Sequence, residues 1–313
     1  MRLMISSASA KIPLLSAAKS ALLKLDPNGS ILAADRDSNV VSKFLADEFW
    51  QMPSTSDDNV EKIINGCLDR NIDFVLPSRD AELLFWARHK NAFHQKNIHI
   101  LVAPIAGIEL CLDKLAFARF GKEKALPIIA TSENISDIYA DYFVVKERYG
   151  AGSKAIGLGL DKSSALKHAA TLQSPIFQPL IRGKEVSIDA WLDKNAKLKG
   201  HIYRYREKVQ HGESQISTTA ILSQYDALIR QLLEGMQLTG PVVLQAMIDT
   251  DNKLWVIECN GRFGGASTLG IKAGLDSLYW SLTETLGRNI SAIPFNPLAR
   301  PLTQIRYAQD IYL

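Results

Sequence analysis

Short apolar runs alternate with longer amphipathic stretches along the first 112 residues of the chain. Runs of four to six residues have the length of buried strands, whereas the longer stretches carry apolar residues at helical spacing. Strands that alternate with helices predict a parallel sheet covered by helices on both faces. The expected strands are 3–6, 31–35, 73–77 and 98–103, and the expected helices are 11–25, 57–70 and 79–93.

The turn after the first expected strand contains no glycine, since residues 6–11 read Ser-Ser-Ala-Ser-Ala-Lys. A dinucleotide-binding fold needs glycines there, so a dinucleotide cofactor is not expected. The loop 78–80 follows another strand at its carboxyl end, where open sheets place ligands. Ser78 is therefore a weak candidate for a substrate contact, and a loop residue without a ligand is the alternative.

Beyond residue 112 the pattern changes to a helix and then to strands separated by glycine-containing loops. Asp113 is a suitable N-cap for a helix that we expect to end near Gly121. Residues 141–160 then read as strand, loop and strand, and Lys146 ends the first of these strands. The small-residue loop could lie over phosphates, but glycine pairs are common in hairpins and the stretch is no Walker P-loop. The candidate loop residues are Gly150, Gly152 and Ser153.

An extended connector precedes a strand with alternating polar residues. Residues 178–181 would offer backbone donors and acceptors to an adenine edge, and Glu185 could take ribose hydroxyls. Glu185, Ser187 and Asp189 share one face of the expected strand. A hairpin with one solvated face explains the same pattern. The connector residues are Gln178, Pro179, Leu180 and Ile181.

The pattern at 241–260 predicts a β-hairpin with Asp251 and Asn252 at the centre of its turn. In that register Gln245 lies opposite Glu258 and Val243 opposite Asn260. Side chains alternate along a strand, so the oxygens of Gln245, Glu258 and Asn260 share one face, an arrangement that suits Mg²⁺. Arg262 follows and could brace a transferring phosphoryl group. A satisfied polar cluster at the end of a strand is the alternative.

Three cations alternate along one face of the stretch 201–214, which could receive a carboxylate substrate. A solvated edge strand protected by charge is the competing interpretation. The three cations are Arg204, Arg206 and Lys208.

Composition limits the function classes. A chain of 313 residues holds about two domains, and a net charge of +3 without a run of like charges does not favour nucleic-acid binding. The three cysteines are widely spaced and are expected to be free thiols. Residues 1–15 do not resemble a secretory signal, and no apolar run has the length of a membrane helix. We therefore expect a soluble, cytoplasmic protein without membrane or nucleic-acid partners.

These motifs together resemble the ATP-grasp superfamily, and most of all the ATP-binding modules of the carbamoyl-phosphate-synthase large chain and their stand-alone relatives. The resemblance implies an α/β fold, with α+β character in its second part. It implies a Rossmann-like pre-ATP-grasp domain at 1–112 and a two-subdomain ATP-grasp domain at 113–313, with a mobile lid subdomain at about 124–178. The stretches that carry it are Lys114, 144–157, 178–193 and 245–267.

The resemblance also implies roles for single residues. Lys114 and Lys146 would contact nucleotide phosphates beneath the glycine loop, residues 178–181 would hold adenine, and Glu185 would hold ribose. The two departures from the family pattern are Glu147 and Gly261, which stand where many relatives have proline. Arg262 would be catalytic, and the magnesium ligands would be Gln245, Glu258 and Asn260.

The expected function is that of an ATP-dependent ligase, in which ATP and Mg²⁺ (or Mn²⁺) activate a substrate carboxylate as an acyl phosphate that an amine then attacks. One alternative is a kinase that stops at phosphoryl transfer, and another is a non-catalytic nucleotide-binding subunit. The partners would be small molecules, and association into a homodimer is left open.

Overall fold

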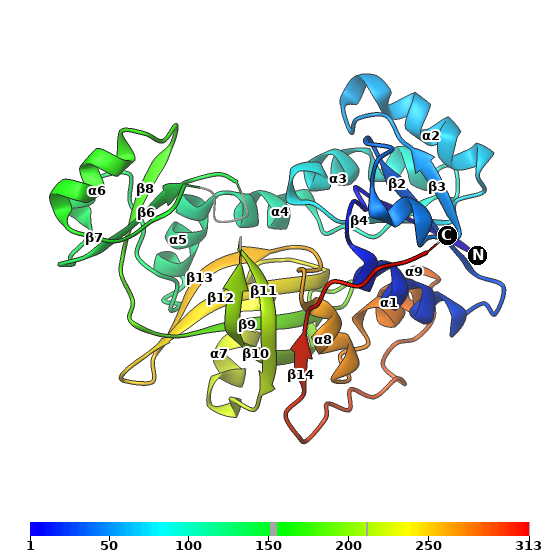
Figure 1. Ribbon diagram of the computed structural model, residues 1–313. Helices are drawn as coiled ribbons and strands as arrows, with labels where there is room; N and C mark the ends of the chain where they lie inside the picture. Colours follow the sequence, from blue (N-terminus) through cyan, green and yellow to red (C-terminus); the bar gives the residue numbers. More distant parts are fainter. Residues whose placement is uncertain (151–154, 211, 313) are drawn as a thin grey trace.

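The structure is a computed structural model that describes residues 1–150, 155–210 and 212–312. Its strands form three separate sheets (Figure 1). The first is a parallel sheet of the order β3-β2-β1-β4-β5. Its strands are β1 (Arg2–Ser6), β2 (Ser30–Asp35), β3 (Glu48–Gln51), β4 (Phe74–Pro77) and β5 (His99–Ile100), and its helices are α1 (Ile12–Leu23), α2 (Val60–Asp69) and α3 (Asp80–His94).

All four strands predicted for this part form, and the parallel sheet is confirmed. The edge strand β3 was not predicted, because only Trp50 of its four residues is buried and the apolar pattern is correspondingly weak. Strand β1 lies between β2 and β4, so the chain order reverses direction between β1 and β4. In open parallel sheets such a reversal leaves a crevice at the carboxyl ends of the two strands.

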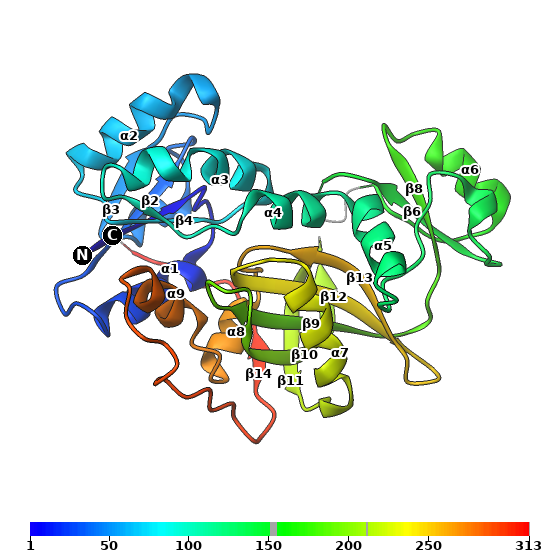
Figure 2. The ribbon, with the colours of Figure 1, turned by 180° about the vertical axis from the view of Figure 1, so that it is seen from behind.

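The second sheet is antiparallel and has the order β13-β12-β9-β10-β11-β14. One of its faces is apolar and packs into the main hydrophobic core through residues such as Ile188, Leu244 and Val256. Helix α7 packs against this apolar face and lies in front of the sheet in the view of Figure 2. The elements are β9 (Gly183–Leu192), β10 (Leu198–Gln210), β11 (Glu213–Ala220), α7 (Asp226–Gly235), β12 (Gly240–Asp249), β13 (Leu254–Asn260) and β14 (Thr303–Ile305).

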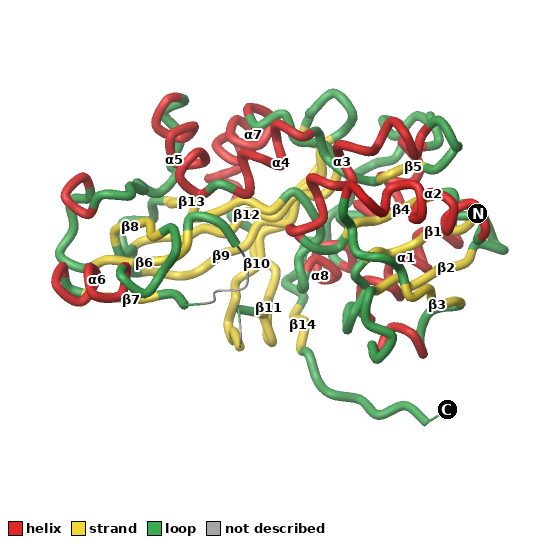
Figure 3. The backbone as a smooth tube through the Cα atoms, turned by 90° about the horizontal axis from the view of Figure 1, so that it is seen from above, coloured by secondary structure: helices red, strands yellow, loops and turns green. Residues whose placement is uncertain are grey.

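The third sheet has three antiparallel strands, β7-β6-β8, and a small core of its own around Phe143, Val145 and Phe177. It lies at the opposite end of the molecule from the parallel sheet (Figure 3). Strand β8 belongs to this sheet and β9 to the six-stranded one, so the interpretation of 175–193 as a hairpin was wrong. The elements are β6 (Phe143–Glu147), β7 (Gly157–Leu160), α6 (Lys162–Ala169) and β8 (Pro175–Pro179).

The expected N-cap at Asp113 is confirmed, because its carboxylate accepts hydrogen bonds from the N–H groups of Leu115 and Ala116. Helix α5 continues two residues past Gly121, to Glu123. No helix in the described ranges is both long and apolar enough to cross a membrane. The remaining elements are α4 (Ile105–Leu112), α5 (Lys114–Glu123), α8 (Ser267–Lys272), α9 (Ser277–Thr285) and the short 3₁₀ helices η1 (Val41–Phe44), η2 (Asp57–Asn59), η3 (Ile135–Asp137) and η4 (Ser223–Tyr225).

Candidate active site

The hairpin of β12 and β13 has the predicted register at its open end. Gln245 lies opposite Glu258, and Val243 lies opposite Asn260. The predicted turn was wrong by one residue, since Asp249 N–H donates to the carbonyl of Lys253 at 3.0 Å and a three-residue loop follows. Asn252 has a φ of 59° in that loop, as three-residue hairpin loops require. The register is restored by a bulge between the pairs Gln245–Glu258 and Ala246–Val256, a step that leaves Ile257 unpaired.

This bulge determines the direction of Glu258. Leu254 and Val256 both belong to the hydrophobic core, so simple alternation would send residue 258 into the core as well. The extra residue turns Glu258 to the other face, beside Asn260, and returns Cys259 to the core. The thiols of Cys67, Cys111 and Cys259 are free, as predicted.

Three oxygen-bearing side chains therefore share the polar face of the sheet at its end. Asn260 Nδ2 lies 3.5 Å from Glu258 Oε1, and Gln245 Oε1 accepts a hydrogen bond from Arg206 at 3.3 Å. A rotation of the Asn260 amide would present its oxygen instead of its nitrogen. One carboxylate and two amide oxygens form a donor set that fits Mg²⁺, which prefers oxygen ligands and retains positions for phosphates and water.

Two lysines from different elements approach this face. Lys114 begins α5 and its ammonium donates to the carbonyl of Gly150 at 2.8 Å. Lys146 lies on β6, and its ammonium has no hydrogen-bond partner among the described residues. Burial lowers the pKa of Lys146 to about 8; Lys114 adds to the lowering and Glu258 opposes it. Burial likewise lowers the pKa of Lys114.

Gly150 has a φ of 108°, a conformation that side chains rarely adopt, and a Cβ there would meet open space. Gly152 and Ser153 lie outside the described residues. Glu147, one of the two departures from the family pattern, accepts hydrogen bonds from the N–H groups of Gln173 and Ser174, both at 2.8 Å. Its carboxylate therefore fixes the chain that leads into β8.

Residues 178–181 keep only some of the free backbone hydrogen-bond donors and acceptors that the sequence predicted for them. Gln178 is buried, and its side-chain amide donates to Thr131 at 2.8 Å. Pro179 has no N–H, and the N–H of Leu180 donates to Tyr142 at 2.9 Å. In the described part of the chain, the carbonyl of Leu180 and the N–H of Ile181 have no backbone partner. This pair of groups is free to meet a planar ligand edge.

The face that carries Glu185, Ser187 and Asp189 is covered rather than solvated, so that alternative was wrong. Asp189 is 2% exposed and accepts hydrogen bonds from Arg204 Nε and Ser267 Oγ, both at 2.7 Å. Helix α8 begins at Ser267 and covers this part of the sheet. Glu185 forms an ion pair with Arg206.

Strand β10 lies between β9 and β11 and is not an edge strand, so the interpretation as a solvated edge was wrong. Arg204 is 3% exposed and Arg206 is partly buried on the polar face of the sheet. Lys208 is exposed beyond a bulge in the pairing of β10 with β11 and does not join them. The expected group of three cations is therefore a group of two.

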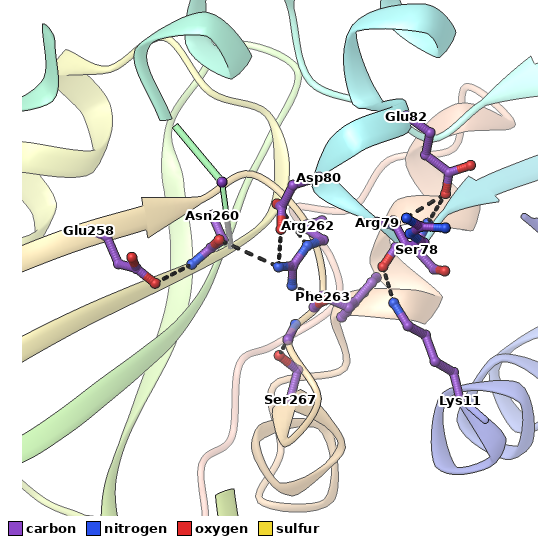
Figure 4. A network of polar contacts seen from close by, with 12 residues as sticks. Lys11, Ser78, Arg79, Asp80, Glu82, Glu258, Asn260, Arg262, Phe263 and Ser267 are labelled. Carbon is purple, nitrogen blue, oxygen red and sulfur yellow. Dashed lines mark hydrogen bonds and ion pairs between the residues drawn. The ribbon is translucent and has the colours of Figure 1, made fainter. Parts of the chain in front are cut away.

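Arg262 is held by a residue of the parallel-sheet domain. Its Nε donates to Asp80 Oδ1 at 2.8 Å, its Nη2 also pairs with Asp80, and its Nη1 donates to the carbonyl of Phe263 at 2.9 Å (Figure 4). Asp80 is the first residue of α3 and follows the loop that contains Ser78. The sequence indicated this loop as a ligand position but gave no sign that Asp80 contacts Arg262.

The Ser78 hydroxyl forms hydrogen bonds within the parallel-sheet domain. It donates to the backbone of the loop after β1, with Ser6 O at 2.6 Å and Ser7 O at 2.9 Å, and the residue is 1% exposed. The carbonyl of Ser78 accepts from the ammonium of Lys11. Lys11 was not among the predicted site residues, because a single lysine after a serine-rich turn carries no recognisable pattern.

Two family models match the sequence. The model described as "PylC-like, N-terminal domain" matches residues 3–101. The model described as "ATP-grasp in the biosynthetic pathway with Ter operon" matches residues 171–308 and so includes the polar face of the six-stranded sheet. No curated protein matches the chain by sequence.

Solved structures of low sequence identity share the fold across nearly the whole chain. The biotin carboxylase domain of the Hydrogenobacter thermophilus 2-oxoglutarate carboxylase, solved with MgADP and bicarbonate, is 17% identical, with a TM-score of 0.72 over 94% of this chain and 72% of that one. The L-amino acid ligase from Bacillus licheniformis is 15% identical, with a TM-score of 0.73 over 96% and 78%. The Staphylococcus aureus N5-carboxyaminoimidazole synthetase, solved with ADP, is 16% identical, with a TM-score of 0.71 over 92% and 78%.

Proposed function

We propose that this chain, which belongs to the ATP-grasp superfamily, is an ATP-dependent ligase that joins a carboxylate to an amine or a related nucleophile. The observation that carries the proposal is the meeting of three groups at one end of the six-stranded sheet. These groups are the oxygen donors of β12 and β13, the buried lysines of α5 and β6, and an arginine in the glycine-rich turn. Together they supply a metal site, phosphate contacts and a charge next to the transferring group.

Nucleotide binding is assigned to the side of the sheet that faces β6 and β8. Lys146 has a buried ammonium without a partner among the described residues, and phosphate oxygens would supply one. The ammonium of Lys114 donates to Gly150 at the beginning of the glycine loop and would contact the same phosphates. The free carbonyl of Leu180 and N–H of Ile181 would take the adenine edge, and Glu185, paired with Arg206, would take the ribose hydroxyls.

The metal position is assigned to Gln245, Glu258 and Asn260. Mg²⁺, or Mn²⁺ in its place, neutralises phosphate charge when bound there. These three side chains, with a single carboxylate among them, would hold the metal and leave its other positions to phosphate and water.

The reaction has two steps. A carboxylate oxygen of the substrate attacks the γ-phosphorus of ATP and ADP leaves; the amine then attacks the acyl carbon, phosphate leaves, and the amine loses a proton. Arg262 lies two residues beyond Asn260 and would hold the charge on the phosphoryl oxygens in both steps. Such transfers depend on positioning and charge neutralisation, so no protein nucleophile is required.

The substrate carboxylate has a candidate contact in Arg204. Its Nε is bound to Asp189, while its two terminal nitrogens have no hydrogen-bond partner among the described residues. A buried guanidinium with unused donors is a receptor for a carboxylate. Arg206 contacts Glu185, Gln245 and the carbonyl of Gly212, so it organises the site through its neighbours.

We also propose where the domains begin and end. We place the first domain at 1–112 and the ATP-grasp domain at 113–313, with a lid of about 124–178 that contains the three-stranded sheet and its own core. We further propose a cytoplasmic location and association into a homodimer. One of the similar solved structures is described as a dimer.

The test is a screen of small carboxylic acids and amines for ADP release that depends on both. Hydroxylamine in place of the amine should trap the acyl phosphate as a hydroxamate. ADP release with a stable phosphorylated product and no dependence on an amine would favour the kinase. Nucleotide binding without turnover for any pair would favour a non-catalytic subunit.

A further inference from the structure

The loops at the carboxyl ends of β1 and β4 lie at the reversal of strand order and reach the candidate active site through Asp80. The loop after β1 ends at Lys11, and the loop after β4 leads into Asp80, the first residue of α3, which holds Arg262. Parallel sheets bind ligands at such a reversal of strand order. Ser7 and Ser9 in the first loop have φ values of 50° and 40°, a strained conformation for serine that is frequent near functional sites.

Lys11 places a positive charge between these two loops. Its ammonium contacts the carbonyl of Ser78, and it forms no ion pair within the described ranges. The two carboxylates whose charges act on Lys11 are Glu82 and Asp80, and both also have other partners. Asp80 is taken by Arg262, and Glu82 accepts from the N–H groups of Ser78 and Arg79, from Ser7 Oγ and from Trp86 Nε1. Lys11, Arg79 and Arg262 together carry one positive charge more than Glu82 and Asp80 carry negative charge, and this excess favours the binding of an anion.

The position of Lys11 relative to Arg262 indicates which anion fits. In Figure 4 the labelled side chains run from Glu258 through Asn260 and Arg262 to Lys11 on the far side. The carboxylate that is phosphorylated must lie near the metal ligands and Arg262. An anion at Lys11 would therefore be a different group of the same substrate.

We propose that the loops 7–11 and 78–80 bind a second anionic group of the acid substrate, with Lys11 as its direct contact. The substrate class is then an acid with two anionic groups, such as a dicarboxylic acid. This inference rests on the proposed function, because the first carboxylate is the one that ATP activates. Arg79 is exposed at the same loop and adds positive charge to the approach.

The charge on Lys11 should make this binding depend on pH. Burial lowers the pKa of Lys11 to about 8, and Arg262 and Arg79 add to the lowering, while Glu82 and Asp80 oppose it. Above pH 8 the free protein loses the ammonium charge. The KM for a dicarboxylic acid should therefore rise above pH 8 in the wild type, and much less in Lys11→Arg, which stays charged.

The experiment measures ADP release with MgATP and pairs of mono- and dicarboxylic acids of equal chain length. We expect the wild type to prefer the dicarboxylic member, and Lys11→Met to remove that preference. The KM for the dicarboxylic acid should rise about 10- to 100-fold, as for loss of one hydrogen bond to a charged group, while the KM values for ATP and the monocarboxylic acid stay within about threefold. Lys11→Arg should retain part of the preference.

Lys90→Met is the matched control, because Lys90 also donates to a backbone carbonyl of this domain, Val102 O at 3.1 Å, and lies outside the loops 7–11 and 78–80. Equal changes for both acids in Lys11→Met, or no preference in the wild type, would overturn the inference. If no acid supports ADP release, the proposed function fails, and labelling of Lys11 with acetic anhydride decides the inference separately. Protection by dicarboxylic but not monocarboxylic acids supports the anion site, whereas equal labelling with and without them refutes it.

Discussion

Arg262 and Asp80 are 182 residues apart in the chain, yet Arg262 Nε donates to Asp80 Oδ1 at 2.8 Å and Nη2 pairs with the same carboxylate. Asp80 starts α3 of the parallel-sheet domain, and Arg262 belongs to the turn after β13. The two side chains are 15% and 17% exposed, so solvent screens the pair only in part. A guanidinium group that is held through two of its nitrogens has one orientation. This contact therefore sets the direction of the Arg262 side chain at the site.

Asp80→Asn should lower the maximal rate of ADP formation by about 10-fold, because the amide keeps the shape but removes the charge that orients Arg262. The KM for ATP should stay within about threefold, since Asp80 contacts neither lysine of the nucleotide site. Asp80→Glu, measured under the same conditions, should recover part of the rate. A large rise in the KM for ATP with an unchanged maximal rate would assign Asp80 to nucleotide binding instead.

Glu258→Gln should retain the fold and abolish ADP formation. The substitution preserves the side-chain shape on the polar face of β13 but removes the single carboxylate among the three proposed metal ligands. Rates are to be measured across a titration of Mg²⁺ and of Mn²⁺, with thermal unfolding as the control for folding. Unchanged turnover at saturating Mg²⁺ would remove Glu258 from the metal site.

The sequence predicted the pairing of Gln245 with Glu258 correctly, because two deviations from the expected hairpin cancel. The turn is one residue longer than the predicted pair Asp251–Asn252, and the bulge at Ile257 shifts the register back before Glu258. Local patterns gave the strands and their pairing because alternation and turn residues act over a few positions. A bulge leaves no comparable pattern in a single sequence.

Contacts between distant segments could not be predicted in the same way. Asp80 and Arg262 meet only because the two domains pack together, and Lys11 reaches the carbonyl of Ser78 only because β1 and β4 are neighbours. Asp189 shows the reverse case. The alternation of polar and apolar residues along β9 allowed the face with Asp189 to be solvated. Helix α8, from another part of the chain, covers this face. Burial of this kind depends on tertiary packing, which the periodicity of one strand does not contain.

Lys146→Ala should weaken ATP binding by about 2–3 kcal/mol, as for loss of a hydrogen bond between charged groups in a buried position. Adenosine has no phosphates, so its affinity should change much less. Calorimetric titration with ATP and with adenosine compares the two losses directly. Equal losses for both ligands would mean that the substitution damaged the fold and not the phosphate contact.

His201 should make the stability of the fold depend on pH. Burial lowers the pKa of His201, and its hydrogen bond to Asp226 opposes this lowering. The folded state thus binds fewer protons than the unfolded state, so stability is lost as the pH falls below the unfolded pKa of about 6.5. His201→Gln should flatten the decrease in unfolding temperature between pH 7 and pH 5. The same decrease in His201→Gln and in the wild type would show that other groups cause it.

Arg262→Ala separates the ligase from the kinase. In the ligase, Arg262 holds charge that builds up on the phosphoryl oxygens and persists in the acyl phosphate, so it acts after nucleotide binding. ATP affinity should remain nearly intact, and the maximal rate should fall by about 100-fold or more, as for loss of a preorganised charge stabiliser. Arg262→Lys should restore only part of the rate, because an ammonium cannot reproduce the two-nitrogen contact with Asp80.

Hydroxylamine trapping completes this comparison. With ATP and the acid alone, the wild type should yield a hydroxamate, and Arg262→Ala should yield very little. The acyl phosphate explains this difference, because hydroxylamine attacks its activated carbonyl, whereas a phosphorylated hydroxyl group has no such carbon. If the wild type consumes ATP with its acid but forms neither hydroxamate nor amide, the acyl-phosphate mechanism is wrong, and phosphoryl transfer to a stable product takes its place.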